Sequence, residues 1–346
     1  MSKTDTIPVT LFRGDGIGPE IVEATLKALD ALGAPFDWHE QTAGLAAVDA
    51  GLDPLPDAAL DSVAQTRLAL KGPLTTPIGA GYRSVNVRLR EAFELYANVR
   101  PCEMLVPGGR FSDLDINLVL VRENMGGFYV GVEHFIRIGD DPHAVAEASG
   151  IITREGVRRI ARFAFEYAVK NGRRKLTVVH KANILKALTG LFLETVLDVG
   201  KDFEGQLEIE DRIVDNTAMQ LIINPTQFDV ILTTNMFGDI LSDEIAGLVG
   251  GLGLAPGGNI GTDAALFEAV HGSAPDIAGQ NIANPTALMQ AAAMMLDHVE
   301  RQDLSGRLRA ALRQCLKDPK TRTRDLGGDL TTARYADAVG DAIRSL

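Results

Sequence analysis

The sequence has little cysteine, no surplus of positive charge and no long hydrophobic run, and each shortage excludes a class of protein. Its two cysteines, Cys102 and Cys315, are far apart and form no C-x-x-C pair, so we expect reduced thiols in a cytosolic protein. The formal net charge of −12 argues against nucleic acid and anionic membrane as partners, because both require a cationic face. No stretch of about 18 apolar residues occurs, and MSKTDTIPVTLF at the start lacks the apolar core of a leader. We therefore predict a cytoplasmic protein.

The chain nevertheless has ample apolar residues for a large folded core. Of its 346 residues, 46% are hydrophobic, which favours two lobes or one large α/β unit. Short β-rich runs alternate with helical runs, and this alternation predicts an α/β protein with largely parallel strands. The predicted strands and the helices that follow them are 9–12 and 19–32, 68–70 and 84–96, 116–121, 176–180 and 183–199, and 230–234 and 239–249.

Two neighbouring segments, 128–150 and 152–170, predict an arm and a helix. Thr153 precedes apolar residues at helical spacing, so we expect a helix over 152–170 with Thr153 as its cap. The stretch 128–150 alternates in character and shows no clear helix. We interpret it as an arm or hairpin that pairs with a second chain.

Serine, asparagine and arginine are concentrated in the segment 82–100. If Ser84 caps a helix, Asn86 and Arg90 stand four apart on one face of that helix, near its partially positive N-terminus. Arg100 begins the next predicted strand, and its guanidinium can clasp a carboxylate with two hydrogen bonds. In so acidic a chain, this concentration predicts a local site for a small polyanion.

Carboxylates and a lysine provide candidates for metal binding and proton transfer. Asp239 and Asp243 are four apart on a predicted helix and can share a Mg²⁺ or Mn²⁺ ion, although an isolated pair of this kind is more often a solvated acidic face. Asp215, after a short predicted strand, offers a third carboxylate. Lys181 follows a predicted strand at the end where α/β sheets place their sites, which favours an acid or base; the alternative is a surface lysine at a turn.

Two loops carry weaker signals. The glycines of FRGDGIGPE follow the first strand as in a phosphate-binding loop, but their G-x-G-x-G spacing does not match the dinucleotide fingerprint. No acidic residue clearly ends the second strand, so we do not predict a Rossmann fold. The run 271–287 is a polar loop before a helix that we expect Asn284 to cap, with Pro285 at its first position.

The chain resembles the isocitrate/isopropylmalate dehydrogenase family, the metal-dependent β-decarboxylating dehydrogenases that act on isocitrate, 3-isopropylmalate, homoisocitrate and tartrate. The motifs that carry the resemblance follow one another along nearly the full length: GDGIGPE, KGPLTTP, S-x-N-x-x-L-R, YANVRP, VRENMGGFYVGVE, HKANILK, GDILSDE and HGSAPDIAG. The resemblance implies an α/β fold of two lobes that is not a Rossmann fold, with cofactor and substrate in a cleft, and a homodimer that shares its active sites. It implies a large cofactor-binding domain of 1–95 and 250–346, a small domain with the dimer interface of 96–126 and 154–249, and an arm of 127–153.

The resemblance also implies roles for particular residues. Arg90, Arg100 and Arg122 match the ligands of the malate part of the substrate. Tyr129 and Lys181 match the pair that transfers protons. The implied ligands of Mg²⁺ or Mn²⁺ are Asp215, Asp239 and Asp243, with Lys181 and Asp215 coming from the neighbouring subunit. The implied cofactor-binding residues are Thr76, His271, Gly272, Ala274, Asp276, Ile277 and Asn284.

Ser84 and Asn86 decide the predicted substrate. Isopropylmalate enzymes place leucines there, whereas a hydroxyl and an amide can hydrogen-bond a third carboxylate. Against an alkyl arm these polar groups would stay unpaired, at a cost of roughly 1 to 3 kcal/mol each. We therefore predict the oxidative decarboxylation of isocitrate to 2-oxoglutarate and CO₂, a step of the tricarboxylic acid cycle. Homoisocitrate, one methylene longer, is the runner-up, ahead of 3-isopropylmalate.

Asp276 and Ile277 predict NAD, so the chain most resembles the NAD-dependent isocitrate dehydrogenases. Relatives that use NADP carry lysine and tyrosine there, whereas an aspartate accepts ribose hydroxyls and repels a 2′-phosphate. The chain departs from the family pattern at Met125 and Gly126, where members usually have a Ser/Thr-Glu pair. The alternative of another class is a non-catalytic regulatory subunit. Such subunits typically lose acid, base or metal residues, and this chain retains them.

Overall fold

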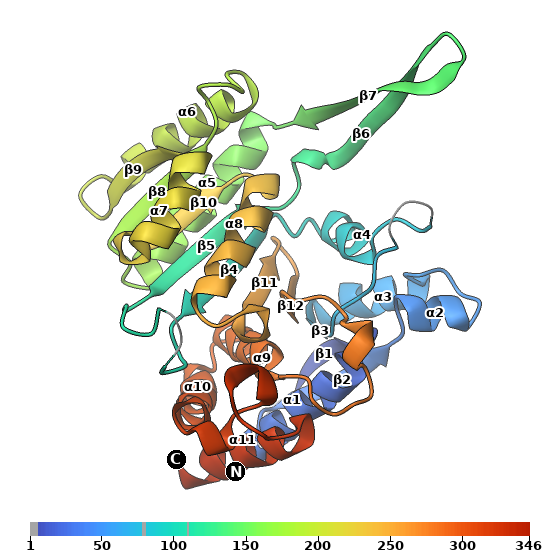
Figure 1. Cartoon of the computed structure of the whole chain (residues 1–346), viewed down its shortest axis with the longest axis vertical. Helices are drawn as coiled ribbons and strands as arrows, with labels where there is room; N and C mark the ends of the chain where they lie inside the picture. Colours follow the sequence, from blue (N-terminus) through green and yellow to red (C-terminus); the bar gives the residue numbers. More distant parts are fainter. Residues whose placement is uncertain (1–5, 78–80, 109–110) are drawn as a thin grey trace. The chain divides into compact units, whose positions relative to one another are not determined.

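The chain folds into two compact units, each assembled from separate stretches of sequence (Figure 1). The computed structural model describes residues 6–77, 81–108 and 111–346. Unit 1 consists of Met1–Leu95, Pro101–Asp115 and Ala246–Leu346, and unit 2 consists of Tyr96–Arg100 and Ile116–Ile245. Residues 1–5 lie outside the described residues. They belong to the segment MSKTDTIPVTLF, for which the sequence predicted no leader.

Unit 1 is a sheet covered by helices on both faces. Its strands are β1 (Ile7–Phe12), β2 (Phe36–Gln41), β3 (Leu68–Lys71), β11 (Pro256–Ile260) and β12 (Ala265–Ala269). Its helices are α1 (Gly18–Leu32), α2 (Leu45–Asp49), α3 (Asp57–Thr66), α4 (Val85–Ala92), α9 (Thr286–His298), α10 (Gln302–Lys317) and α11 (Thr332–Ser345). The strand order is β2-β1-β3-β12-β11, and the neighbours are parallel except for the antiparallel pair β11 and β12.

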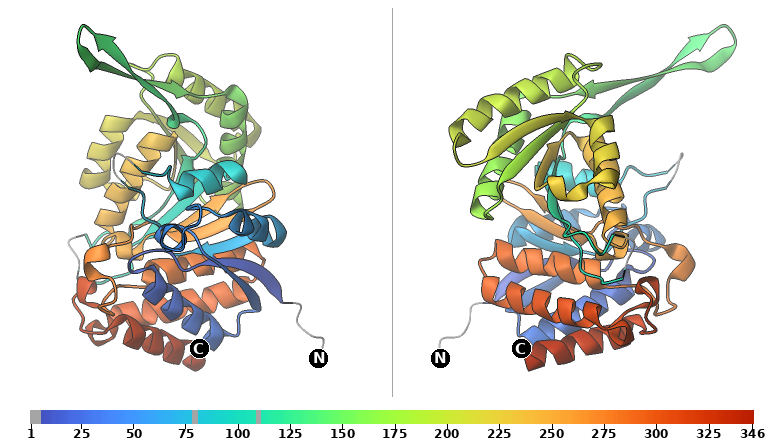
Figure 2. Two further views of the ribbon diagram at one scale, coloured as in Figure 1. Left: turned by 90° about the vertical axis from the view of Figure 1, so that its right-hand side faces the viewer. Right: turned by 60° about the vertical axis from the view of Figure 1, so that its left-hand side comes forward.

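The alternation of side chains along β12 divides the core of unit 1 into two layers. Phe267 belongs to the core that the sheet shares with α1 and the C-terminal helices α9 to α11. Leu266 belongs to the core on the other face, with α3 and α4. Figure 2 shows the C-terminal helices lying together against one side of these strands. Glu268, two residues after Leu266 and therefore directed toward the same face, is the charged exception in this apolar strand.

Unit 2 is a second α/β layer with a long hairpin. Its strands are β4 (Ala97–Glu103), whose first four residues belong to this unit, β5 (Asn117–Glu123), β6 (Gly127–Ile138), β7 (Asp141–Ile151), β8 (Lys175–His180), β9 (Glu208–Ile213) and β10 (Val230–Thr233). Its helices are α5 (Arg154–Lys170), α6 (Leu188–Gly200), α7 (Val214–Ile223) and most of α8 (Asn235–Leu248). The strand order is β4-β5-β10-β8-β9, and β5, β10, β8 and β9 run parallel.

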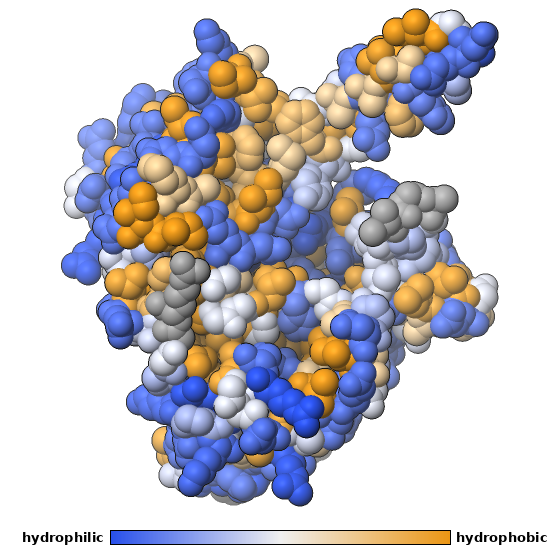
Figure 3. Space-filling model, viewed as in Figure 1, coloured by the Kyte–Doolittle hydropathy of each residue, from blue (hydrophilic) through white to orange (hydrophobic). Residues whose placement is uncertain are grey.

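The predicted arm is the antiparallel hairpin of β6 and β7. It extends away from the rest of unit 2 in Figure 1. Large apolar side chains, including Phe135 at 58% and Ile138 at 63%, are exposed on it, and Figure 3 shows this hydrophobic surface toward the end of the arm. Helix α5 follows, and the Thr153 hydroxyl accepts a hydrogen bond from the Gly156 N–H at 3.1 Å, as the predicted cap requires.

The prediction of largely parallel α/β structure is confirmed, but three helix boundaries were wrong. The helix predicted over 84–96 ends at Ala92, because Glu94 adopts a left-handed φ of 45°. The helix predicted over 183–199 begins at Leu188, after turns in which Lys181 accepts backbone hydrogen bonds. The helix predicted over 239–249 begins four residues earlier, at Asn235. No helix in the described part of the chain has the length and apolar character that crossing a bilayer requires.

Candidate active site

The carboxyl ends of β5 and β10 bring Arg122 to the start of α8. The parallel register pairs Thr233, the last residue of β10, with Arg122. Gly238 lies on the first turn of α8, and a Cβ there would stand 2.6 Å from Cγ of Arg122. The missing side chain therefore lets the Arg122 stem lie directly against the helix. Arg122 is 1% exposed, so its charge needs partners inside the unit.

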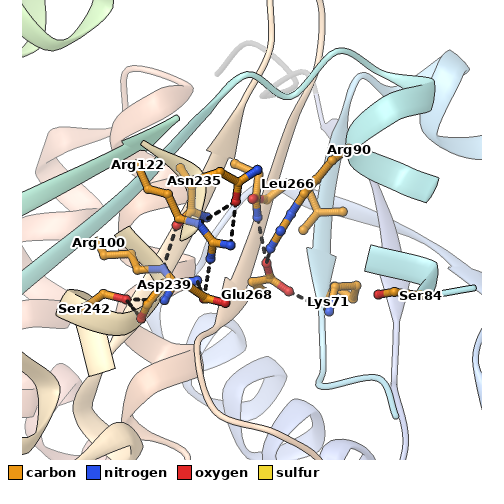
Figure 4. A network of polar contacts seen from close by, with 12 residues as sticks. Lys71, Ser84, Arg90, Arg100, Arg122, Asn235, Asp239, Ser242, Leu266 and Glu268 are labelled. Atoms are coloured by element: carbon orange, nitrogen blue, oxygen red, sulfur yellow. Dashed lines mark hydrogen bonds and ion pairs between the residues drawn. The ribbon is translucent and has the colours of Figure 1, made fainter. Parts of the chain in front are cut away.

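Neutral and acidic groups of α8 provide these partners (Figure 4). The Asn235 amide oxygen accepts hydrogen bonds from Nε and Nη2 of Arg122 at 3.1 and 2.7 Å. Nη1 of Arg122 pairs with the Asp239 carboxylate. The guanidinium is thus fixed by a fork of bonds to one helix.

Arg100 reaches the same helix from β4. Its Nε donates to the Asn98 side-chain oxygen at 2.6 Å, and its Nη1 donates to the Ser242 hydroxyl at 2.5 Å. Nη2 of Arg100 lies 3.5 Å from the Asp239 carboxylate, and Nη1 lies 3.7 Å from the Asp243 carboxylate. Two buried arginines therefore converge on one face of α8.

Tyr129 joins this cluster from β6. Its hydroxyl donates to Oδ2 of Asp239 at 2.6 Å, and Cζ of Arg122 lies 5.3 Å from the centre of its ring. The structure thus brings together five residues that the sequence analysis selected from separate motifs, namely Arg100, Arg122, Tyr129, Asp239 and Asp243.

Asp239 and Asp243 provide the hard oxygen ligands that Mg²⁺ and Mn²⁺ prefer. Partial burial raises the pKa of Asp243; Arg100 opposes this increase and the Asp239 charge adds to it. A bound cation would relieve the repulsion between the two carboxylates, so their chemistry fits a divalent ion. They do not complete a site alone, because no group of three metal-binding side chains occurs among the residues that the structure describes.

Lys181 and Asp215 contact each other. Lys181 directly follows β8, as predicted, and its ammonium pairs with the Asp215 carboxylate in the first turn of α7. This hydrogen bond lowers the pKa of Asp215. Within one chain, then, Asp215 is bound to Lys181 and does not join the carboxylates of α8.

In unit 1, α4 presents Ser84, Asn86 and Arg90. Ser84 is the N-cap by position, but its hydroxyl makes no capping bond and instead accepts from Thr76 at 3.2 Å, so the predicted side-chain cap is wrong. The Asn86 side-chain oxygen is buried and accepts no hydrogen bond within the described residues. Such an atom favours a ligand that brings a donor.

Arg90 lies beside a buried ion pair. Glu268 accepts from the Asn259 amide at 2.7 Å, its other oxygen lies 2.7 Å from the Lys71 ammonium, and the Arg90 guanidinium is 3.8 Å away (Figure 4). Burial alone would raise the pKa of Glu268, but the charges of Lys71 and Arg90 outweigh it and lower the pKa to about 2. Glu268 is thus a permanent anion at ordinary pH.

The loop over 271–287 leads into α9, which starts one residue later than predicted. Asn284 accepts from the Thr286 N–H at 3.0 Å, but the helix begins at Thr286 with Pro285 as its N-cap, one residue later than predicted. Burial lowers the pKa of His271, and its Nε2 has no partner in the described part of the chain. Asp276 and Ile277 form a single turn, Pro275–Ile277, after Ala274 with its left-handed φ of 39°.

The glycine loop before α1 is a packing element. A Cβ on Gly16 would stand 2.0 Å from the Ser273 carbonyl oxygen, and that oxygen accepts from the Ile17 N–H at 2.9 Å. Asp15 in the same loop accepts from the Thr75 N–H at 2.8 Å. The glycines permit these close approaches within unit 1.

A sequence model of the isocitrate/isopropylmalate dehydrogenase family matches residues 8–343. The chain belongs to this family. Isocitrate dehydrogenase from Methylococcus capsulatus superimposes with a TM-score of 0.93 at 53% identity, covering 97% of this chain and 99% of that one. Catalytic subunit 5 of the mitochondrial NAD isocitrate dehydrogenase of Arabidopsis thaliana is 45% identical over 98% of this chain and 89% of its own. One regulatory subunit of the mitochondrial NAD isocitrate dehydrogenase of Dictyostelium discoideum is 44% identical over 95% of this chain and 90% of its own.

Family membership confirms the predicted fold class and corrects the predicted location. The superposition confirms an isocitrate dehydrogenase-type α/β fold. The cytoplasmic location predicted from composition is wrong by this comparison, because both curated relatives are mitochondrial. Net charge and apolar content reflect the folded part of a chain, whereas cellular location depends on targeting signals.

Sequence reasoning missed the residues that hold the arginines of this family member. Asn98, Asn235 and Ser242 are neutral and common, and nothing local distinguishes them. Lys71 and Glu268 had a usable signal, since a charged side chain in or at the end of an apolar strand requires a buried partner.

Proposed function

We propose that this chain is a catalytic, NAD-dependent isocitrate dehydrogenase that converts isocitrate to 2-oxoglutarate and CO₂. The observation that carries the proposal is the convergence of Arg100, Arg122, Tyr129 and Asp239 in unit 2. Two buried guanidinium groups beside a tyrosine hydroxyl suit a hydroxy acid with several carboxylates. The names of the relatives from Methylococcus and Arabidopsis support the same activity.

The arginines bind the malate part of the substrate in this proposal. Asn98, Asn235 and Ser242 hold Arg100 and Arg122 through neutral oxygens, and the Asp239 carboxylate, which pairs with Arg122, would be drawn toward the metal ion when the ion is bound. A substrate carboxylate can therefore gain charge-assisted hydrogen bonds. Arg90 on α4 supplies the third guanidinium.

Asp239 and Asp243 would hold Mg²⁺ or Mn²⁺, with Asp215 of a second copy as the third carboxylate. When bound, the ion polarises the substrate's hydroxyl oxygen and later its carbonyl oxygen, which favours loss of hydride and then of CO₂. Asp239 also anchors Arg122 and Tyr129, so the same carboxylate orients the binding and proton-transferring side chains.

Tyr129 and Lys181 move the protons. Lys181 and Tyr129 relay the proton of the substrate hydroxyl and later return a proton to the carbon that loses CO₂. The Tyr129 hydroxyl already donates to a carboxylate, which fixes the direction of its proton. Lys181 acts from the neighbouring copy.

Ser84 and Asn86 select isocitrate by binding its third carboxylate. The Ser84 O–H and the Asn86 amide N–H groups can donate to that carboxylate, and an alkyl arm would leave these donors unpaired. Homoisocitrate remains the second candidate, because one added methylene changes selectivity by only about 10- to 200-fold.

Unit 1 binds NAD, the hydride acceptor, through the loop that contains His271, Gly272, Ala274, Asp276 and Ile277. The exposed Asp276 carboxylate accepts the hydroxyls of the adenosine ribose and disfavours a 2′-phosphate. Nε2 of His271, which has no partner among the described residues, can accept a hydrogen bond from the cofactor. Thr76 and Asn284 complete this proposed set.

The active form is a homo-oligomer with shared sites. Two observations support this proposal: apolar residues are exposed along the β6–β7 arm, and the carboxylate pair on α8 has no third metal-binding side chain beside it among the described residues. The relatives from Arabidopsis and Dictyostelium are named as subunits, and the latter as regulatory, so a regulatory chain of a hetero-oligomer is the alternative.

The deciding assay measures formation of reduced nicotinamide by absorbance with isocitrate, homoisocitrate or 3-isopropylmalate, each with NAD and with NADP, in the presence of Mg²⁺. We expect isocitrate with NAD to be fastest. Preference for another acid would contradict the roles of Ser84 and Asn86, and preference for NADP would contradict that of Asp276. Absence of turnover throughout would favour the regulatory alternative.

Shared sites are tested by subunit complementation. Lys181→Met and Tyr129→Phe each inactivate every site of their own homodimer. Co-expressed in equal amounts, they form hybrid dimers with one intact site if Lys181 acts across the interface, and activity returns to roughly a quarter of wild type. If both residues act from the same chain, no site recovers.

A further inference from the structure

Asn235 lies between two groups that the proposed reaction needs in register, the substrate-binding Arg122 and the base of the arm that carries Tyr129. It is 1% exposed and begins α8, one turn before Asp239. Its side-chain oxygen accepts twice from Arg122, and its side-chain nitrogen donates to the Gly126 carbonyl oxygen at 3.2 Å. One amide thus joins β5, α8 and the turn into β6.

The chemistry of these partners sets the orientation of the amide. Arg122 offers donors and no acceptor, so the oxygen of Asn235 must face it. The amide nitrogen then faces the Gly126 carbonyl, which can only accept. A flipped amide would set like groups against each other on both sides.

The turn that Asn235 holds is also fixed from its other side. The buried Glu123 carboxylate accepts from the N–H groups of Met125 at 2.7 Å and Gly126 at 2.8 Å. A Cβ on Gly126 would lie 3.0 Å from the Ile151 carbonyl oxygen and 3.2 Å from the Glu123 carboxylate. The glycine that replaces the family's usual glutamate therefore fits tightly against Glu123 and the end of β7.

The turn at Gly126 and Gly127 fixes the position of Tyr129 on β6. Gly127 follows with a left-handed φ of 75°, and two residues later the Tyr129 hydroxyl meets Asp239 on α8. The route from Asn235 through Gly126 to Tyr129 and back to Asp239 is a closed loop of contacts within unit 2. A change at Asn235 therefore reaches both the arginine and the tyrosine.

We propose that Asn235 is a positioning residue that sets Arg122 for substrate binding with its oxygen and Tyr129 for proton transfer with its nitrogen. This inference rests on the proposed function. The neutral Asn235 amide would hold Arg122, the arm that carries Tyr129 and helix α8 in fixed relative positions. Neither bond alone would couple all three.

The first test compares Asn235→Ala with the control Thr233→Val. Thr233, two residues earlier, donates its buried hydroxyl to the Val179 carbonyl oxygen, so the control also removes a buried hydrogen bond near the site but leaves Arg122 untouched. For Asn235→Ala we expect the KM for isocitrate to rise roughly 10- to 100-fold and kcat to fall, with the KM for NAD changed less than about threefold. The inference would be overturned by equal changes in the kinetic constants of the two variants. It would also be overturned if Asn235→Ala raised the KM for isocitrate and the KM for NAD equally.

The second test does not depend on activity. Asn235→Asp keeps an acceptor for Arg122 but sets an oxygen against the Gly126 carbonyl, so hydrogen exchange at amides 126–130 should accelerate in this variant and in Asn235→Ala. Thr233→Val should leave that exchange unchanged. If the wild-type protein fails to oxidise isocitrate but both Asn235 variants exchange faster than wild type, the proposed function is refuted and the positioning role of Asn235 is retained. If the wild-type enzyme is active and exchange is unchanged in both Asn235 variants, only the positioning role of Asn235 is refuted.

Discussion

The Glu268 cluster of unit 1 and the Asp239 cluster of unit 2 both combine carboxylates with basic side chains, but they bury opposite charges. In unit 1 the carboxylate of Glu268 is buried, and Lys71 and Arg90 surround it. In unit 2 the guanidinium groups are buried, and the Asp239 and Asp243 side chains are 40% and 57% exposed. The first cluster is closed, whereas the second presents its carboxylates to solvent.

The difference indicates which cluster stabilises and which binds. A buried carboxylate with several donors is costly to disturb, since removing it leaves uncompensated charges. Buried arginines held by Asn98, Asn235 and Ser242 remain able to bind an incoming anion, while exposed carboxylates beside them can take a cation. We therefore expect changes at Asp239 and the residues around it to affect activity, and changes at Glu268 and Lys71 to affect folding.

Metal removal should have the largest effect and should separate the two clusters most clearly. Chelation with EDTA should lower turnover of isocitrate on the order of 10³-fold or more, because metal polarisation supplies several kcal/mol in the transition state. The unfolding temperature of the substrate-free protein should change little, because Arg122 already neutralises Asp239. Added Mn²⁺ should restore the rate. Unaltered turnover after chelation would show that Asp239 and Asp243 serve another purpose.

Tyr129→Phe should reduce kcat by roughly 10²- to 10⁴-fold while leaving stability almost unchanged. The lost hydroxyl is a proton donor in the proposed reaction, and general acid catalysis contributes a factor of this size. The side chain is 37% exposed, so folding depends little on it. Steady-state kinetics and thermal unfolding measure the two effects. Tyr167→Phe on α5, distant in sequence and outside the cluster, serves as the control and should retain full activity.

The fold was largely predictable, because alternating strands and helices leave a local pattern in the sequence. The site was predictable where one residue type carries its own chemistry. Lys181 and Asp239 were selected as charges at a strand end and on a helix face, whereas Arg122 was selected by the family resemblance. The approach of Arg122 to Asp239 depends on the β5–β10 register, which no local pattern reports.

What sequence reasoning missed depends on distant partners. Asn235 is a neutral residue at a helix start, and its importance comes from Arg122 on another strand. Glu268 needs Lys71 from another part of unit 1. The helix predicted to begin at 239 starts at Asn235 and includes Gly238, a poor helix former that lies against the Arg122 side chain.

Glu268→Gln should destabilise the folded chain by about 3 to 5 kcal/mol, because it leaves Lys71 buried without an opposite charge. Urea unfolding at neutral pH measures this free energy. Glu103→Gln is the matched control, since its ion pair with Arg313 is solvent-exposed and should contribute less than about 1 kcal/mol. Equal losses in both variants would contradict the distinction between a closed cluster and a surface pair.

The smallest and most specific effect is the pH dependence that Glu268 imposes. Its pKa is about 2 in the folded chain, below the ordinary value of 4.5, so its contribution is complete above pH 4.5 and is lost as the pH falls toward 2. The difference corresponds to roughly 3 kcal/mol at most, and only part of it disappears at pH 3. The free energy of unfolding of wild type should therefore fall more steeply between pH 5 and pH 3 than that of Glu268→Gln, by roughly 1 to 2 kcal/mol. Parallel curves for the two proteins would mean that the pKa of Glu268 is the same in the folded and unfolded chain. The Glu268 cluster would then contribute nothing to the acid sensitivity of folding.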